Sequence, residues 1–113
     1  MRDKIVIYQK PTCSKCRATL SLLKESGEEF ESINYYEVPL TADKLRELIQ
    51  KLNLPVRDIL RKDEPAALDL SAASDDEILA AMVRNPDLIQ RPIVERGAKA
   101  VLARPAEKLR DIL

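Results

Sequence analysis

Apolar residues recur along the chain with two different periods, and each period predicts a different element. The β-branched run KIVIY (residues 4–8) predicts a buried strand. The later segment EFESINYY alternates polar residues with Ile33 and Tyr35, which predicts a second strand. Between these two segments, leucines and good helix formers from Cys16 onward predict a helix that stops at Gly27. The chain is therefore expected to open with a strand, a helix and a strand.

The middle of the chain carries the periodicity of helices. Thr41 is placed as the N-cap of a helix, and Leu40 just before it can pack against Leu45 as a hydrophobic staple. The apolar positions of this helix are three or four residues apart: Leu45, Leu48, Ile49 and Leu52. Ser74 and Glu77 have the spacing of a capping box, which predicts that a further helix begins there. We expect the middle of the chain to be helical.

The last part of the chain returns to strands and then ends in a helix. RPIVERGAKAVLARP predicts a hairpin of two short strands, Ile93 to Glu95 and Ala100 to Leu102, joined through Gly97. In PAEKLRDIL, Pro105 occupies a position typical of a first helical turn. The apolar residues that we expect on one face of this helix are Leu109, Ile112 and Leu113.

The order of these elements predicts the fold class. It is β-α-β, then a helical insertion, then β-β-α, which is typical of an α/β, thioredoxin-like fold. Such a fold has a central mixed sheet, here of about four strands, flanked by helices. No repeat, low-complexity tract or linker interrupts the pattern, so residues 1–113 are expected to form a single domain.

The amino-acid composition excludes some classes of binding partner. With 45% hydrophobic and 34% charged residues, the chain has the composition of an ordinary soluble globular protein. Its 19 basic and 19 acidic residues cancel, so no overall positive field favours nucleic acid. The purely apolar runs are too short for a membrane span, and the N-terminus lacks the apolar segment of a signal peptide. We therefore expect a cytoplasmic protein that binds neither nucleic acid nor membrane.

The only two cysteines, Cys13 and Cys16, stand between the first predicted strand and the first predicted helix. A structural zinc site needs four ligands, usually Cys or His. The chain has two cysteines and no histidine, so no metal site is expected. In a reducing compartment a close cysteine pair is more often catalytic than a permanent bridge.

The position of the pair suggests a role for each cysteine. A helix N-terminus stabilises a thiolate, and this favours Cys13, with Lys15 and Arg17 adding positive charge nearby. Cys16, one turn further, is placed to attack a species formed on Cys13. The alternative is that Cys16 is simply a small apolar helix residue and that Lys15 and Arg17 are solvated.

Three arginines stand at the ends of predicted elements. Arg61 follows a short apolar turn in DILRKDEP, and Arg91 precedes Pro92, which opens the hairpin. Arg104 lies between the last strand and the last helix. Because guanidinium groups bind oxyanions through two parallel hydrogen bonds, these three side chains can converge on one bound oxyanion. Four other arginines are expected to be solvated: Arg2, Arg46, Arg84 and Arg110.

Four segments together resemble one family, the glutaredoxin-type arsenate reductases and their close relatives. The segments are IYQKPTCSKCRATLSLL, LPVRDILRKDEP, ILAAMVRNPDLIQRPIV and VLARPAEKLRDIL, and they match in order and approximate spacing over essentially the whole chain. The resemblance implies that Cys13 is the nucleophile. It implies that Arg61, Arg91 and Arg104 bind the oxyanion, and that the Arg91–Pro92 peptide bond is cis.

The chain departs from that family at two positions. Arsenate reductases of this type commonly have a histidine shortly before the nucleophile, where this chain has Gln9. Reductases that rely on glutathione often have serine one turn after the nucleophile, where this chain has Cys16. The C-x-x-C loop that results resembles the redox switch of the related Spx-type transcription regulators, and thioredoxins generally.

The resemblance implies a thiol-dependent oxidoreductase that reduces arsenate to arsenite. Cys13 attacks arsenate, Cys16 or glutathione resolves the intermediate, and no cofactor is bound; glutathione with glutaredoxin, or thioredoxin, is the external reductant. One alternative is an Spx-like regulator that binds RNA polymerase and senses redox state through a Cys13–Cys16 disulfide. A second is a general thiol–disulfide oxidoreductase whose arginines bind glutathione carboxylates. The presence of Arg104 favours the arsenate reductase.

Overall fold

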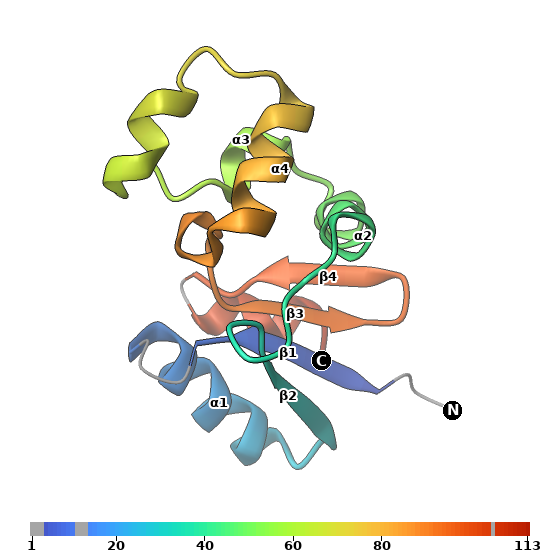
Figure 1. Cartoon of the computed structure of the whole chain (residues 1–113). Helices are drawn as coiled ribbons and strands as arrows, with labels where there is room; N and C mark the ends of the chain where they lie inside the picture. Colours follow the sequence, from blue (N-terminus) through green and yellow to red (C-terminus); the bar gives the residue numbers. More distant parts are fainter. Residues whose placement is uncertain (1–3, 11–13, 105) are drawn as a thin grey trace. The chain divides into compact units, whose positions relative to one another are not determined.

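The first and last parts of the chain together form one four-stranded sheet (Figure 1). The computed structural model describes residues 4–10, 14–104 and 106–113. The strands are β1 (Ile5–Gln9), β2 (Phe30–Asn34), β3 (Ile93–Arg96) and β4 (Lys99–Leu102). Their order is β2-β1-β3-β4, with β1 and β2 parallel and the other two pairs antiparallel. This mixed sheet confirms the predicted fold class.

All four predicted strands are observed, with their ends shifted by one or two residues. Tyr35, which the alternation placed in the second strand, lies just beyond β2 and is buried. The hairpin between β3 and β4 turns at Gly97, whose φ of 58° lies in the left-handed region that favours glycine.

The chain divides into two compact units. The first comprises Met1–Val38 and Arg91–Leu113 and contains the sheet, and the second, Pro39–Gln90, contains the helical insertion. Within the ranges that the structure describes, no helix combines the length and the apolar character that crossing a membrane requires.

In the first unit, helix α1 (Ser14–Ser26) and the 3₁₀ helix η3 (Ala106–Asp111) pack on the same face of the sheet. The buried core between them combines residues of β1, α1, β3 and the C-terminal segment: Ile5, Ile7, Leu23, Val94, Ala103, Leu109 and Ile112. Helix α1 begins two residues earlier than predicted. It ends as expected before Gly27, whose φ of 76° is left-handed.

The C-terminal helix differs from the prediction in its geometry. It is a 3₁₀ helix, in which residues three apart share a face, so Leu109 and Ile112 both point into the core. Leu113 was predicted on that same face. It is 39% exposed instead, because it follows the end of η3 at Asp111 and does not continue the face of that helix. Pro105 lies outside the described residues.

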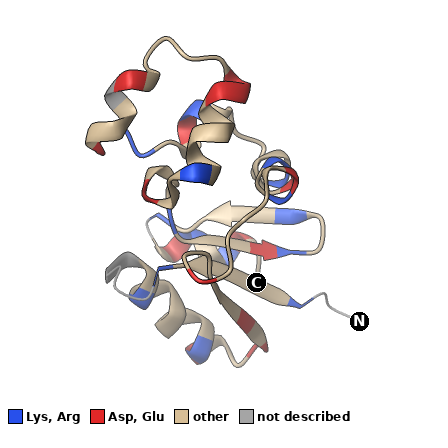
Figure 2. Cartoon of the chain, viewed as in Figure 1, with Lys and Arg blue, Asp and Glu red and all other residues tan. Residues whose placement is uncertain are grey.

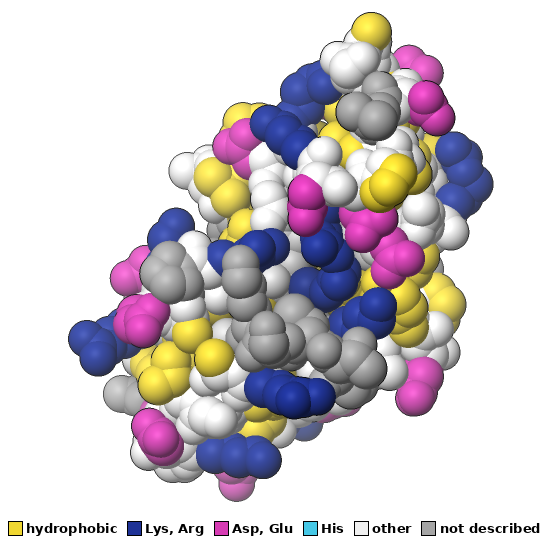
Figure 3. All heavy atoms as spheres, turned by 90° about the vertical axis from the view of Figure 1, so that its left-hand side faces the viewer, with side chains coloured by type: hydrophobic (Ala, Val, Ile, Leu, Met, Phe, Trp, Pro, Cys, Tyr) yellow, Lys and Arg dark blue, Asp and Glu magenta, His cyan; other side chains and the backbone are white. Residues whose placement is uncertain are grey.

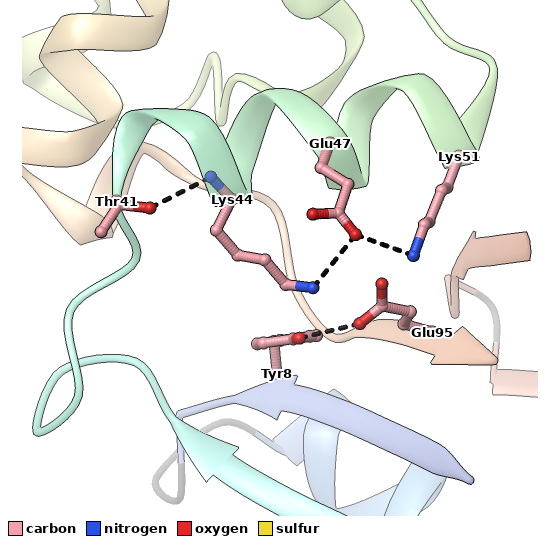
Figure 4. Close-up of polar contacts among 6 residues, drawn as sticks. All are labelled: Tyr8, Thr41, Lys44, Glu47, Lys51 and Glu95. Carbon is pink, nitrogen blue, oxygen red and sulfur yellow. Dashed lines mark hydrogen bonds and ion pairs between the residues drawn. The ribbon is translucent and has the colours of Figure 1, made fainter. Parts of the chain in front are cut away.

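Three polar contacts tie distant parts of the first unit together. Arg96 of β3 lies 3.0 Å from the Glu28 carboxylate and donates a second hydrogen bond to the Ile112 carbonyl at 3.2 Å. On the opposite face of the sheet, the buried Tyr8 hydroxyl donates to Glu95 Oε1 at 2.9 Å (Figure 4). These contacts connect β1, β3, the start of β2 and the C-terminus.

The second unit is helical, as expected. Its elements are α2 (Ala42–Leu52), α3 (Val56–Ile59), η1 (Pro65–Leu70), α4 (Asp75–Arg84) and η2 (Pro86–Leu88). Thr41 caps α2 by accepting a hydrogen bond from the Lys44 backbone at 3.1 Å (Figure 4). Of the apolar positions that the periodicity indicated, Leu45, Leu48 and Ile49 are buried, whereas Leu52 at the end of the helix is only half-buried.

The exposed face of α2 carries a small ion-pair network. Glu47 Oε1 lies 2.9 Å from Lys51 Nζ and 3.4 Å from Lys44 Nζ. The hydrogen bond from Lys51, together with the charges of both lysines, holds the pKa of Glu47 below its usual range. Because the group is solvent-exposed, water and salt screen this network.

The capping box predicted for α4 is present. The Ser74 hydroxyl accepts from the Glu77 backbone and the Glu77 carboxylate accepts from the Ser74 backbone, each at 3.2 Å. The hydrogen bonds from Ser74 hold the pKa of Glu77 below its usual range. Acidic residues lie in the first turn of α4 and Arg84 lies in the last (Figure 2). This placement of charges interacts favourably with the helix dipole.

The short helices α3, η1 and η2 were not predicted individually, because three to six residues are too few to show a period. A side chain that pattern reading missed holds this region together. The Arg57 guanidinium donates to the carbonyls of Leu70 and Ser71 at 3.4 Å each, and to that of Ala73. Arg57 thereby fixes the segment that joins η1 to α4.

Candidate active site

The candidate nucleophile lies between the end of β1 and the start of α1. Cys13 and the Lys15 side chain lie outside the described part of the structure. Cys16 is the third residue of α1 and is completely buried, whereas Arg17 is exposed. A bulky reductant therefore has no direct access to the Cys16 sulfur from solvent.

Gln9, the last residue of β1, is a buried polar side chain next to this junction. It is 7% exposed, and its Nε2 donates to the Ser32 hydroxyl of β2 at 2.6 Å. Its Oε1 is buried and has no hydrogen-bond partner within the described ranges. Sequence reasoning noted Gln9 only as a departure from a family pattern; the partnership with Ser32 needed the sheet register.

A basic side chain after β1 and two aromatic side chains after β2 lie together at the carboxyl ends of these strands. Lys10 Nζ lies 4.8 Å from the centre of the Tyr36 ring, within the range of a cation–π contact. The centres of the Tyr36 and Tyr35 rings lie 5.1 Å apart. The backbone N–H of Tyr36 donates to the Asn34 side chain at 3.0 Å. The carboxyl ends of the parallel strands β1 and β2 are thus ordered by side-chain contacts.

Two of the three predicted oxyanion arginines come from neighbouring segments of the first unit. The Arg91–Pro92 peptide bond is cis, as the resemblance implied, and Arg91 is 8% exposed. The Ala103 N–H donates to the Pro92 carbonyl at 3.0 Å. This bond places the backbone before Arg104 beside the backbone after Arg91, so the two segments that carry these arginines, 13 positions apart, are neighbours in the fold.

Arg61, the third predicted arginine, belongs to the second unit. Its backbone N–H donates to the Leu88 carbonyl at 2.7 Å. Its guanidinium lies 3.5 Å from the Asp63 carboxylate and 3.7 Å from that of Glu64, while its side chain is only 20% exposed. Arg61 Nε is buried without a hydrogen-bond partner among the residues described. The convergence of all three arginines on Cys13 stays a prediction.

Charge on the surface is mixed rather than of one sign. Basic and acidic side chains are interspersed on the face drawn in Figure 3, in keeping with the 19 basic and 19 acidic residues of the chain. Over the described ranges, no group of three or more His, Cys, Asp or Glu side chains is arranged to hold a metal ion.

Comparison with known proteins gives closely similar relatives over the full chain. The model of the ArsC family matches residues 8–112. The chain is 40% identical to an arsenate reductase of Yersinia enterocolitica, over 98% of this chain and 82% of that protein. It is also 40% identical to the uncharacterized protein YfgD of Escherichia coli K12, over 100% and 99%. A solved structure of an arsenate reductase from Vibrio cholerae has a TM-score of 0.93 and 39% identity, covering both chains completely.

Proposed function

The chain belongs to the ArsC family, and on that premise we propose that it is a thiol-dependent arsenate reductase. The observation that carries the proposal is the identity of about 40% to an arsenate reductase over 98% of this chain. Cys13, in a C-x-x-C sequence between β1 and α1, supplies the thiol. We propose that the two units act as one domain and that the protein works in the cytoplasm.

The proposed chemistry uses two thiols and no bound cofactor. The Cys13 thiolate attacks the arsenic atom of arsenate, an S–As bond forms, and one arsenate oxygen leaves as water after protonation. A second thiol then attacks the Cys13 sulfur. The S–S bond forms and the S–As bond breaks, and its electron pair stays on arsenic, which leaves as arsenite. The two thiols are oxidised to a disulfide, which glutaredoxin or thioredoxin reduces through exchange.

The proposed oxyanion site consists of Arg61, Arg91 and Arg104. Three guanidinium groups can stabilise the charge of arsenate and of the arsenite that leaves, because charge-assisted hydrogen bonds are strong in a water-poor site. Two observations support the assignment: Arg91 is buried, and the Pro92–Ala103 hydrogen bond joins its segment to that of Arg104. Lys15 and Arg17 add positive charge near Cys13.

No observation favours the alternative of an Spx-like regulator, and the relatives reported above include arsenate reductases over the full chain. A general thiol–disulfide oxidoreductase would use the same Cys13. The two enzymes differ in whether turnover requires arsenate.

The proposal is tested by arsenate-dependent consumption of NADPH by the purified full chain. One arm contains glutathione, glutaredoxin and glutathione reductase, and the other contains thioredoxin and thioredoxin reductase. Oxidation of NADPH that rises with arsenate and yields arsenite in either arm supports the proposal. Oxidation that needs only a disulfide substrate and ignores arsenate would instead identify a general oxidoreductase.

The role of Cys16 is tested by replacing it with serine. If Cys16 is the second thiol, the variant should lose turnover with thioredoxin alone by at least about tenfold and should retain it when glutathione is added. The burial of Cys16 fits this assignment, because a thiol that is closed to solvent is suited to an internal reaction and not to one with a bulky external partner. Mass spectrometry of the parent after one turnover without reductant should show the loss of two hydrogens.

The Cys16→Ser experiment also has a defined outcome if Cys16 is not the second thiol. If Cys16 only fills space in the core, Cys16→Ser turns over like the parent with both reductants, and the oxidised parent carries a glutathione adduct instead of an internal disulfide. Cys16→Ala is the matched control for packing, since it removes the sulfur without adding a hydroxyl to the buried site.

A further inference from the structure

Thr19 is a completely buried polar residue in the middle of α1 that the chemistry above does not use. Among the side chains of α1 that the structure describes, three are completely buried, and they follow one line along the helix: Cys16, Thr19 and Leu23. Burying a hydroxyl without a hydrogen bond costs about 1–3 kcal/mol, and a valine of the same shape avoids that cost. A threonine at this position therefore points to a polar task inside the first unit.

The geometry of the helix makes Thr19 a neighbour of Cys16. Residues three apart share a face of a helix, with about 5–6 Å between their Cβ atoms. Side chains of a helix lean toward its N-terminus, so the Thr19 side chain reaches back over the turn that carries Cys16. Arg17 and Ala18, which stand between them in the sequence, are exposed and lie on another face. The buried face of α1 thus brings a hydroxyl and a thiol together.

The surroundings of this face are mostly apolar. Gln9, on the same face of β1 as Ile5, is a neutral amide and donates to Ser32. Arg96 lies beside Ile5, at the opposite end of β1 from the start of α1, and pairs with Glu28. The basic groups after β1, before β3 and after β4 are Lys10, Arg91 and Arg104, and such side chains do not titrate near neutral pH. The charged residues of η3 are exposed: Glu107, Lys108, Arg110 and Asp111.

We propose that the Thr19 hydroxyl donates a hydrogen bond to the Cys16 sulfur and thereby prepares this buried thiol for its attack on Cys13. The proposal rests on the proposed function in one respect, namely that Cys16 is the second thiol. Thr19 acts through Cys16 and touches neither arsenate nor the sulfur under attack, so it is a positioning residue.

The chemistry of the attack explains why a donor is needed. Cys16 reacts as a thiolate: its proton passes to water, an S–S bond forms to Cys13, and the bond from Cys13 to its leaving group breaks with the electron pair on that group. Apolar surroundings disfavour a thiolate, whereas a hydrogen bond donated to the charged form favours it. A threonine hydroxyl supplies one such donor without adding a charge to the core.

The experiment treats the purified full chain with one equivalent of dithiobis(nitrobenzoate), which releases a coloured thiolate at each step. The first release comes from attack by Cys13, and the second comes when Cys16 displaces the nitrobenzoate thiolate held on Cys13. The rate of the second release is measured between about pH 5 and about pH 10, a range that spans the titration of a cysteine thiol.

Replacing Thr19 with valine removes the hydroxyl and keeps the shape of the side chain. We expect the midpoint of the second release to move upward by about one pH unit, as the loss of one hydrogen bond to a charged group predicts. At pH 7 the second release should slow at least about threefold, because the higher nucleophilicity of a more basic thiolate offsets part of the loss. The plateau at high pH should not fall, and the first release should be unchanged.

Two further variants separate positioning from structure. Thr19→Ser keeps a hydroxyl at this position and should restore the midpoint of the parent chain. Ser21→Ala is the matched control, because it removes a hydroxyl from an exposed position of the same helix and should leave both releases unchanged. Thermal midpoints of all variants are measured alongside.

The proposal is overturned if Thr19→Val changes only the thermal midpoint, as expected when the hydroxyl donates solely to a carbonyl one turn back in α1. A second release slowed equally at every pH also contradicts it, since that result means displaced packing. So does a parent chain that releases a single thiolate, because Cys16 is then not the second thiol.

The assay contains no arsenate, so its outcome is separate from that of the arsenate reductase test. A midpoint that moves in a chain unable to reduce arsenate leaves the role of Thr19 intact and removes the proposed activity. An unmoved midpoint in a chain that does reduce arsenate removes only the role of Thr19.

Discussion

Replacing Cys13 with serine should abolish arsenate reduction with every reductant, lowering kcat/KM by at least about a thousandfold. The alcohol is a far weaker nucleophile than a thiolate at neutral pH. An arsenate ester formed on oxygen also cannot release arsenite, because no S–S bond can form to return two electrons to arsenic. The measurement is the arsenate-dependent consumption of NADPH described above, with arsenite quantified directly.

Cys16→Ser and chemical labelling serve as controls for the assignment of the nucleophile. Because Cys16 is completely buried, iodoacetamide at pH 7 should modify Cys13 first in the parent chain, as peptide mapping would show. Cys13→Ser should then leave the folded chain nearly inert to labelling. Preferential modification of Cys16, or residual turnover of Cys13→Ser within tenfold of the parent, would assign the nucleophile to the other cysteine.

Removing any one of the three proposed oxyanion arginines should cost about 10²–10³ in kcat/KM, the usual loss when one donor to a developing oxyanion is deleted. Arg91→Ala and Arg104→Ala test the pair whose segments the Pro92–Ala103 hydrogen bond joins. Arg61→Ala tests the arginine of the second unit. Lysine at each position should recover only part of the loss, because an ammonium group keeps the charge but not the two parallel hydrogen bonds.

Solvent-exposed arginines of the same units provide matched controls. Arg110→Ala in η3 and Arg46→Ala in α2 remove the same charge and should leave kcat/KM within about twofold of the parent. Arg46 forms an ion pair with Asp43 at 3.2 Å on an exposed face. Because Arg91 is buried, its variant also needs a thermal midpoint and a circular dichroism spectrum to show that it folds. Equal losses in the control and site variants would mean that general charge, not a defined oxyanion site, governs activity.

The caps and strands were predictable because the interactions that specify them lie within a few residues. Thr41 caps α2 through Lys44, three positions away, and Ser74 pairs with Glu77 over the same spacing. Gly97 closes the hairpin because its own φ is left-handed. The strand alternation and the helical periodicity are likewise local, so the order of elements and the fold class followed from the sequence. The short helices lacked enough residues to show a period.

The candidate site was predictable only as a set of residues. Cys13 and its C-x-x-C spacing are visible in the sequence, and so are the positions of Arg61, Arg91 and Arg104 at element ends. The sequence did not show which arginine side chains are buried, because burial depends on the residues from other segments that pack over them. Arg57 and Arg96 look like the other arginines in the sequence, yet each binds carbonyls 13 to 16 positions away.

The sequence by itself determined the local elements and the chemistry available at the start of α1. Only the tertiary structure decided the strand order, the burial of Cys16 and the pairing of Gln9 with Ser32 across 23 positions. It likewise decided the contact of Tyr8 with Glu95 across 87 positions and the exposure of Leu113. The physical reason is that a local hydrogen bond has a fixed sequence spacing, whereas a contact between distant residues depends on strand register and on the packing of helices against the sheet.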